Sequence, residues 1–109
     1  MKIEIYLTAR DGSYDAHAIY EDGLITIKKG SKIRLSFAQH VRGGKIAKRF
    51  RDDRDVVNLD GITQKECSFN SPSTAAQFVM GSSVNGWTAW HVDRKRNLKQ
   101  YVDAAKENT

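Results

Sequence analysis

The side chains that could perform chemistry are few and lie far apart along the chain. His17, His40 and His91 have no second ligand at helical or hairpin spacing, which is more typical of structural or surface histidines than of a metal site. Cys67 could act as a nucleophile only if a base such as His91 folded beside it. It alternates with Phe69 in an apolar run, so we expect a buried core thiol. The sequence thus indicates no catalytic residue, no metal and no cofactor, and it favours a protein that acts by binding.

A cluster of acidic residues in the middle of the chain could in principle hold a cation. Arginines are interleaved with these residues, and a lattice of surface salt bridges is the more common outcome of such a pattern. The residues concerned are Asp52, Asp53 and Asp55, with Arg49, Arg51 and Arg54.

Positive charge is concentrated in one continuous segment. The chain of 109 residues has a net charge of +5, and residues 28–54 alone carry ten basic against two acidic side chains. The residues before this segment are net acidic, and those after it are balanced. Such a block attracts polyanions through Coulomb forces and counterion release. A solvated face that keeps the protein soluble is the alternative.

The run of hydroxyl residues around Pro72 predicts the start of a helix. Ser71 can cap this helix, and Pro72 fits its first position, where a missing N–H costs nothing. Helix starts also bind anions, because the N–H groups and the helix dipole point to the same place. Capping alone leaves Ser73 and Thr74 without a role, so both interpretations stay open. The expected buried face consists of Ala75, Ala76 and Val79.

Two tryptophans lie three residues apart in the segment Asn85-Gly86-Trp87-Thr88-Ala89-Trp90. A tryptophan in a small domain is usually part of the core, and we expect this of at least one of the two. The alternative is a stacking platform for a nucleobase. We expect residues 87–92 to run extended.

The first third of the chain predicts β structure. Apolar residues alternate with polar ones over residues 2–7, 15–20, 24–28 and 32–37, which is the period of half-buried strands. Asp22-Gly23 between the second and third of these runs is a strong hairpin signal. The fourth run would be a strand with a basic outer face.

Helices are expected later in the chain. Ile46 and Phe50 lie four residues apart and would anchor a charged helix over residues 45–54. The helix that begins near Ser71 should end at Gly81. Asn97 and Gln100 form a capping box that opens a third helix, whose apolar positions are Leu98, Tyr101, Val102 and Ala105.

The order of these elements predicts one α+β domain over residues 1–109. We expect a small antiparallel sheet with two or three short helices packed on it. The single cysteine suits a reducing compartment, and the sequence shows no signal-peptide core and no stretch of bilayer length. We therefore expect a cytoplasmic protein without membrane contact.

The last third of the chain resembles the signature of a known family. The strings are Phe69-Asn70-Ser71-Pro72-Ser73-Thr74-Ala75-Ala76, then Gly81, then Val84-Asn85-Gly86-Trp87-Thr88-Ala89-Trp90, then Leu98. They are similar to the small uncharacterised domain appended to the C-terminus of GIY-YIG nucleases and related prokaryotic proteins. They also resemble the RAMA domain (restriction enzyme and adenine methylase associated). The resemblance covers about residues 12–101 and is most specific over residues 69–98.

The resemblance implies a non-enzymatic domain that binds DNA, with modified DNA among the proposed ligands, in association with a partner nuclease or methylase. This chain itself carries no GIY-YIG or methylase domain. Combined with the basic segment, the resemblance leads us to expect a nucleic-acid-binding module. The expected contacts are Lys28, Lys32, Arg34, Arg42, Lys45, Lys48, Arg49, Ser71, Ser73, Asn85, Trp87 and Trp90. The alternative is a protein-interaction or regulatory module that docks on a partner enzyme without contacting nucleic acid.

Overall fold

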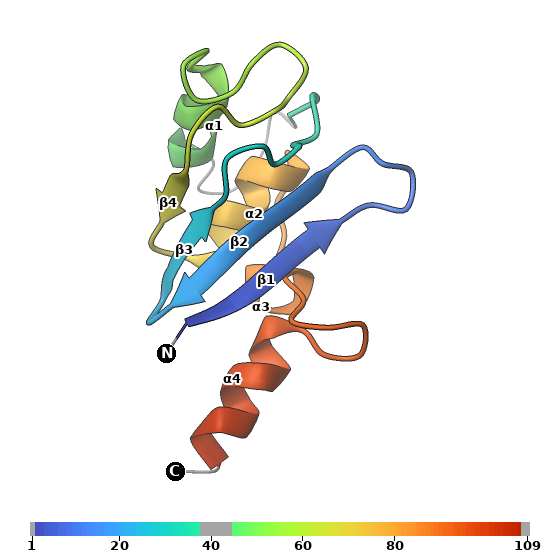
Figure 1. Ribbon diagram of the computed structural model, residues 1–109, viewed down its shortest axis with the longest axis vertical. Coiled ribbons are helices and arrows are strands. Elements are labelled where there is room, and N and C mark those ends of the chain that lie inside the picture. Colours follow the sequence, from blue (N-terminus) through green and yellow to red (C-terminus); the bar gives the residue numbers. More distant parts are fainter. Residues whose placement is uncertain (1, 38–44, 108–109) are drawn as a thin grey trace.

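The computed structural model describes residues 2–37 and 45–107, which form an antiparallel sheet with helices against it (Figure 1). The strands are β1 (Lys2–Thr8), β2 (Asp15–Glu21), β3 (Leu24–Ile27) and β4 (Cys67–Phe69), in the spatial order β1-β2-β3-β4. The helices are α1 (Lys45–Asp52), α2 (Pro72–Met80), α3 (Gly86–Ala89) and α4 (Leu98–Glu107). The expected α+β class is confirmed, with four helices among the described residues against the two or three predicted.

The alternation of apolar residues places the first three strands correctly. Ile5 and Ala18, which are paired across β1 and β2, are both buried, whereas Glu4 and His17, which precede them along the chain, are exposed. The turn between β2 and β3 has positive φ at two successive residues, 50° at Asp22 and 91° at Gly23. This is the twist that a two-residue hairpin requires, so the hairpin prediction is confirmed.

The predicted fourth strand over residues 32–37 is wrong. Lys32 makes only isolated bridges, to Asp15 and to Ile62. The next residues change hydrogen-bond partner at each step: the N–H of Ile33 donates to Gly61, and the N–H of Arg34 donates to Val79 at the end of α2. A ladder cannot form because no single strand lies alongside this segment. The place beside β3 is taken by β4.

Helix α2 lies against the sheet and fills the centre of the core. The predicted start at Ser71 and end at Gly81 are confirmed, as is the burial of Ala75, Ala76 and Val79. Gly81 has the left-handed conformation with φ of 71°, and a Cβ there would lie 2.2 Å from the carbonyl oxygen of Ser36. Glycine is therefore required by the backbone angle and by the close approach of another segment.

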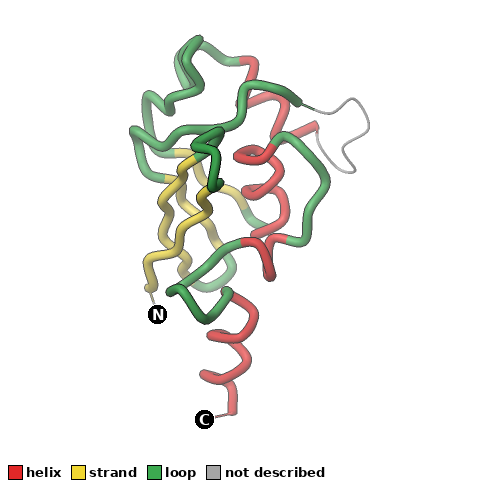
Figure 2. Tube along the Cα trace, turned by 90° about the vertical axis from the view of Figure 1, so that its right-hand side faces the viewer, coloured by secondary structure: helices red, strands yellow, loops and turns green. Residues whose placement is uncertain are grey.

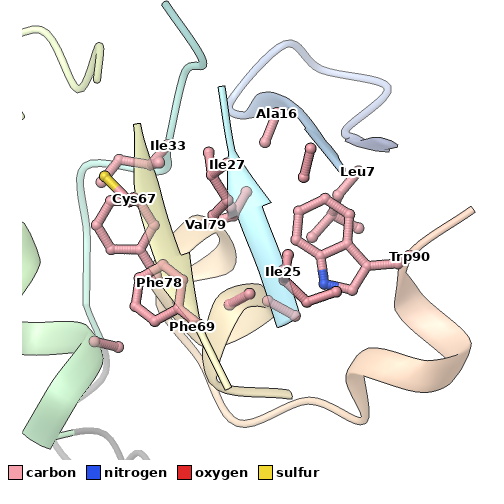
Figure 3. Close-up of a cluster of buried hydrophobic side chains, with 14 of the residues drawn as sticks. Leu7, Ala16, Ile25, Ile27, Ile33, Cys67, Phe69, Phe78, Val79 and Trp90 are labelled. Carbon is pink, nitrogen blue, oxygen red and sulfur yellow. The ribbon is translucent and has the colours of Figure 1, made fainter. Parts of the chain in front are cut away.

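The core is one cluster of buried side chains that extends to both sides of β3 (Figure 3). Phe69 of β4 and Phe78 of α2 meet with ring centroids 5.3 Å apart, and Cys67 lies beside them. On the other side, Trp90 packs near Leu7 and Ile25. All of these side chains are buried, so the predicted core thiol at Cys67 is confirmed.

Helix α1 faces the core with only one of its two predicted anchors, Phe50. Ala47 is fully buried and Phe50 packs on Phe69 with ring centroids 5.0 Å apart, but Ile46 is 54% exposed. The second inward position is held by Arg51, of which only 8% is exposed. Ile46 was thus wrongly predicted as an anchor, because the helix docks through the face that carries Ala47 and Arg51.

The helices lie on one side of the sheet, and the other face is not covered by any helix of the described residues (Figure 2). This open face is polar, and its charges are largely paired. Lys28 contacts Glu4 at 2.9 Å, and His17 contacts Asp15 at 3.0 Å. The hydrogen bond from Lys28 lowers the pKa of Glu4. No helix within the described ranges is long and apolar enough to cross a bilayer.

Candidate nucleic-acid interface

The residues of the basic segment do not share one surface. Lys28 lies on the open face of the sheet, where Glu4 neutralises it. Arg34 turns toward the β1–β2 hairpin, with its guanidinium 5.1 Å from the centroid of the Tyr14 ring. Lys32 is exposed beside β2. Arg42 lies outside the described residues.

Helix α1 carries the remaining predicted cations on its solvent side. Lys45, Lys48 and Arg49 are all exposed. Lys48 pairs with Asp52 at 2.7 Å, one helical turn away. Lys45 and Arg49 have no ion-pair partner within the described part of the chain. Among the described residues, this face therefore carries two cations without an ion-pair partner, and α1 lies at the opposite end of the molecule from α4 (Figure 1).

The predicted salt-bridge lattice of aspartates and arginines is absent from the described residues. Arg51 points inward and donates hydrogen bonds to three main-chain carbonyls, those of Phe78, Arg34 and Ser36. Arg54 donates to the carbonyl of Val57 at 3.1 Å. Burial lowers the pKa of the Arg51 guanidinium. Arg51 thus ties α1 to the end of α2 and to the irregular segment that follows Ile33.

The hydroxyls at the start of α2 have partners within the fold. The Oγ of Ser71 accepts from the N–H groups of Ser73 and Thr74 at 3.2 and 3.4 Å, which is an N-cap. The Oγ of Ser73 accepts from the N–H of Gly86 at 3.0 Å and so ties α2 to α3. Both hydroxyls are used structurally, and the capped N–H groups are not free to meet an anion. We therefore give this helix start no part in the interface.

The two tryptophans differ in environment. Trp90 is 0% exposed, and its indole N–H donates to the carbonyl of Pro72 at 3.0 Å. The expectation that at least one tryptophan belongs to the core is confirmed by Trp90. Trp87 is half-buried and meets Tyr20 edge-on at 6.0 Å between centroids. The extended run predicted for residues 87–92 is wrong for its first half, because Gly86–Ala89 forms a helical turn capped by Asn85. The backbone is extended at Trp90, and His91 makes isolated β-bridges.

A hollow of about 220 Å³ lies between α3 and α4, and we call it the Trp87 hollow. It brings together two predicted contacts, Asn85 and Trp87, with two lysines. Its lining is Asn85, Trp87, Lys99, Val102, Asp103 and Lys106. Lys99 pairs with Asp103 at 2.9 Å.

The α4 residues of the Trp87 hollow were not predicted from the sequence. The capping box is confirmed by reciprocal hydrogen bonds of 2.8 and 2.9 Å between Asn97 and Gln100, so the helix itself was foreseeable. Lys99 and Lys106 are seven residues apart and hence lie on one side of α4. That spacing was a usable signal, but only the packing of α4 on α3 shows that this side faces Trp87.

The hollow has the parts of a platform for an unpaired base. A half-buried indole lies beside an apolar side chain, Val102, and two lysines complete the lining, of which Lys99 is paired with Asp103. An aromatic ring beside basic side chains is the combination that binds single strands. The volume of about 220 Å³ gives room for one planar ring system.

A catalytic pairing of Cys67 with His91 does not occur. His91 bridges Tyr6 on β1, whereas Cys67 belongs to β4 at the other edge of the sheet. Burial raises the pKa of the Cys67 thiol to about 11. Over residues 2–37 and 45–107 there is no group of three potential metal ligands among the histidine, cysteine and carboxylate side chains.

The fold and the sequence together define a small α+β domain in which a four-stranded antiparallel sheet is covered on one face by helices. The chain belongs to the DUF4357 family, described as a domain of unknown function, whose model matches residues 5–102. No curated protein and no solved structure matches the chain.

Proposed function

We propose that this protein is a non-enzymatic nucleic-acid-binding module that stacks an unpaired base on Trp87. The observation that carries the proposal is the Trp87 hollow, in which a half-buried indole lies beside two lysines and Asn85. Stacking on an aromatic ring and ionic contact with the backbone are the two elements of single-strand binding. The exposed cations of α1 would add contacts that depend on salt but not on sequence.

The ligand we propose is DNA, in association with a nuclease or methylase partner. This part of the proposal rests on the resemblance of residues 69–98 to the domain appended to GIY-YIG nucleases and to the RAMA domain. Modified DNA belongs to the same proposal, because an unpaired base held against Trp87 would expose its substituents to Asn85 and the lysines.

A docking module for a partner protein is the second candidate. Among the described residues, three large apolar side chains are more than half exposed, namely Leu35, Ile46 and Leu59. Apolar side chains in such positions are used in protein interfaces. Docking through them would be insensitive to salt, whereas binding to nucleic acid would weaken steeply as salt is added.

Titration of labelled single-stranded and duplex DNA at several salt concentrations tests the proposal. We expect single strands to bind more tightly than duplex and to quench the fluorescence of Trp87. Trp87→Leu should weaken single-strand binding by about tenfold or more, because stacking contributes about 1–3 kcal/mol per base. Trp87→Phe is the matched control, since it keeps an aromatic face and should lose less affinity for single strands.

The proposal fails if no nucleic acid binds at low salt, and protein docking then becomes the first candidate. It also fails if Trp87→Leu binds single strands as the parent does.

A further inference from the structure

A second hollow, of about 320 Å³, lies at the other end of the molecule, beside the C-terminal end of α1. We call it the Arg54 hollow. Its walls come from the segment that follows Ile33, from α1 and from the loop after Arg54; the residues used below are Leu35, Phe37, Arg51, Asp52, Arg54 and Leu59.

The charge of the Arg54 hollow is positive. Arg51, in its lining, is nine-tenths buried and has no carboxylate within ion-pair distance among the described residues. Its hydrogen bonds go to carbonyl oxygens, which stabilise the cation but leave its net charge in place. Arg54 adds a second guanidinium. The one carboxylate in the lining, that of Asp52, is neutralised by Lys48 at 2.7 Å.

The rim of the Arg54 hollow is apolar. Leu35 is 69% exposed and Leu59 is 79% exposed. The ring of Phe37 lies with its centroid 5.0 Å from the Arg51 guanidinium carbon. Large apolar side chains with this much solvent exposure, next to two cations, suit a ligand that has a flat apolar part and an anionic part.

We infer that the Arg54 hollow binds a nucleoside monophosphate, either free or as the phosphorylated end of a strand. A terminal phosphate carries a charge of about −1.5 to −2 at pH 7, which two guanidinium groups match, whereas a phosphodiester within a strand carries one charge. The base would cover Leu35 and Leu59. The guanidinium of Arg34 takes no part, because it lies over Tyr14.

Calorimetric titration with AMP, adenosine and inorganic phosphate tests this site independently of the Trp87 hollow. We expect AMP to bind more tightly than either fragment. Arg54→Gln should weaken AMP binding by about tenfold, since hydrogen bonds to charged groups contribute about 1.5–3 kcal/mol. Arg49→Gln removes the same charge from the outer face of α1 and should leave AMP binding unchanged. Leu59→Ser should weaken binding of AMP but not of phosphate.

Three results would overturn the inference: no binding of AMP at millimolar concentration, equal binding by the Arg54→Gln and Arg49→Gln variants, or loss of AMP binding in Trp87→Leu. The last result would place the nucleotide in the Trp87 hollow. Oligonucleotides with a 5′-phosphate or a 5′-hydroxyl distinguish the two sources: a preference for the 5′-phosphate identifies a strand end, and AMP binding without it identifies a free nucleotide. Failure of this site leaves single-strand stacking on Trp87 untouched.

Discussion

The indole N–H of Trp90 donates a hydrogen bond to the main-chain carbonyl of Pro72 at 3.0 Å. This bond joins the start of α2 to the end of α3, and a second one from Gly86 to Ser73 reinforces it. The two elements approach so closely that a Cβ on Gly86 would lie 2.1 Å from the carbonyl of Pro72. The Ser-Pro-Ser string and the Asn-Gly-Trp string are therefore two halves of one packed corner.

Trp90→Ala should lower the free energy of unfolding by about 3–5 kcal/mol, the usual range for a large buried aromatic residue. Trp87→Ala should cost less, because part of that ring is already in water. Denaturant unfolding of both variants measures the difference. Equal losses of unfolding free energy would show that both rings are buried to the same extent. Trp87 would then offer no exposed ring for stacking.

Arg51→Met should destabilise the fold, because three carbonyls lose a guanidinium donor. The cost is about 1–3 kcal/mol for each carbonyl left without a partner. Arg49→Met makes the same change on the exposed side of α1 and should stay within about 0.5 kcal/mol of the parent. Thermal melts of the two variants compare them. Similar melting temperatures would contradict the structural role of Arg51.

The Cys67 thiol should make stability fall at high pH. Burial raises its pKa from 9.0 to about 11, so the folded state holds the proton over a range in which the unfolded chain releases it. The stabilisation is fully present below pH 9 and is lost as pH rises toward 11. Cys67→Ala should remove this part of the pH dependence, measured by denaturant unfolding between pH 8 and pH 11. A thiol reagent at pH 8 should label the native protein slowly and the unfolded chain quickly.

Replacing Lys45, Lys48 and Arg49 together by glutamate should weaken DNA binding and flatten its dependence on salt. Fewer counterions are released when these cations are absent. The same charge change at Lys2, Lys28 and Lys65, of which the first two lie on the open sheet face, is the control and should alter the slope less. Titrations across salt concentrations give both slopes. Identical slopes would exclude α1 from the interface.

Local patterns in the sequence were sufficient for most of the elements. The alternation in β1 to β3, the Asp22-Gly23 turn, the caps of α2 at Ser71 and Gly81 and the capping box of α4 all depend on residues within about four positions of each other. Neighbouring residues along the chain are enough to set both the alternation of side chains in a strand and the hydrogen bonds of a helix cap. These features could therefore be predicted correctly.

Tertiary packing decided what the local pattern left open. Residues 32–37 alternate like a strand, yet their hydrogen-bond partners are Gly61, Val79 and the guanidinium of Arg51, all distant in sequence. The same packing turned Ile46 outward and Arg51 inward.

The sequence by itself determined an α+β domain with a basic middle segment and at least one core tryptophan. Only the tertiary structure decided that Trp90 fills the core and Trp87 borders a hollow with Lys99 and Lys106. The physical reason is that a side chain's exposure depends on which distant element packs against it. The basic side chains of one sequence segment are separated in space for the same reason. Lys28, Arg34 and Arg49 face three different surfaces.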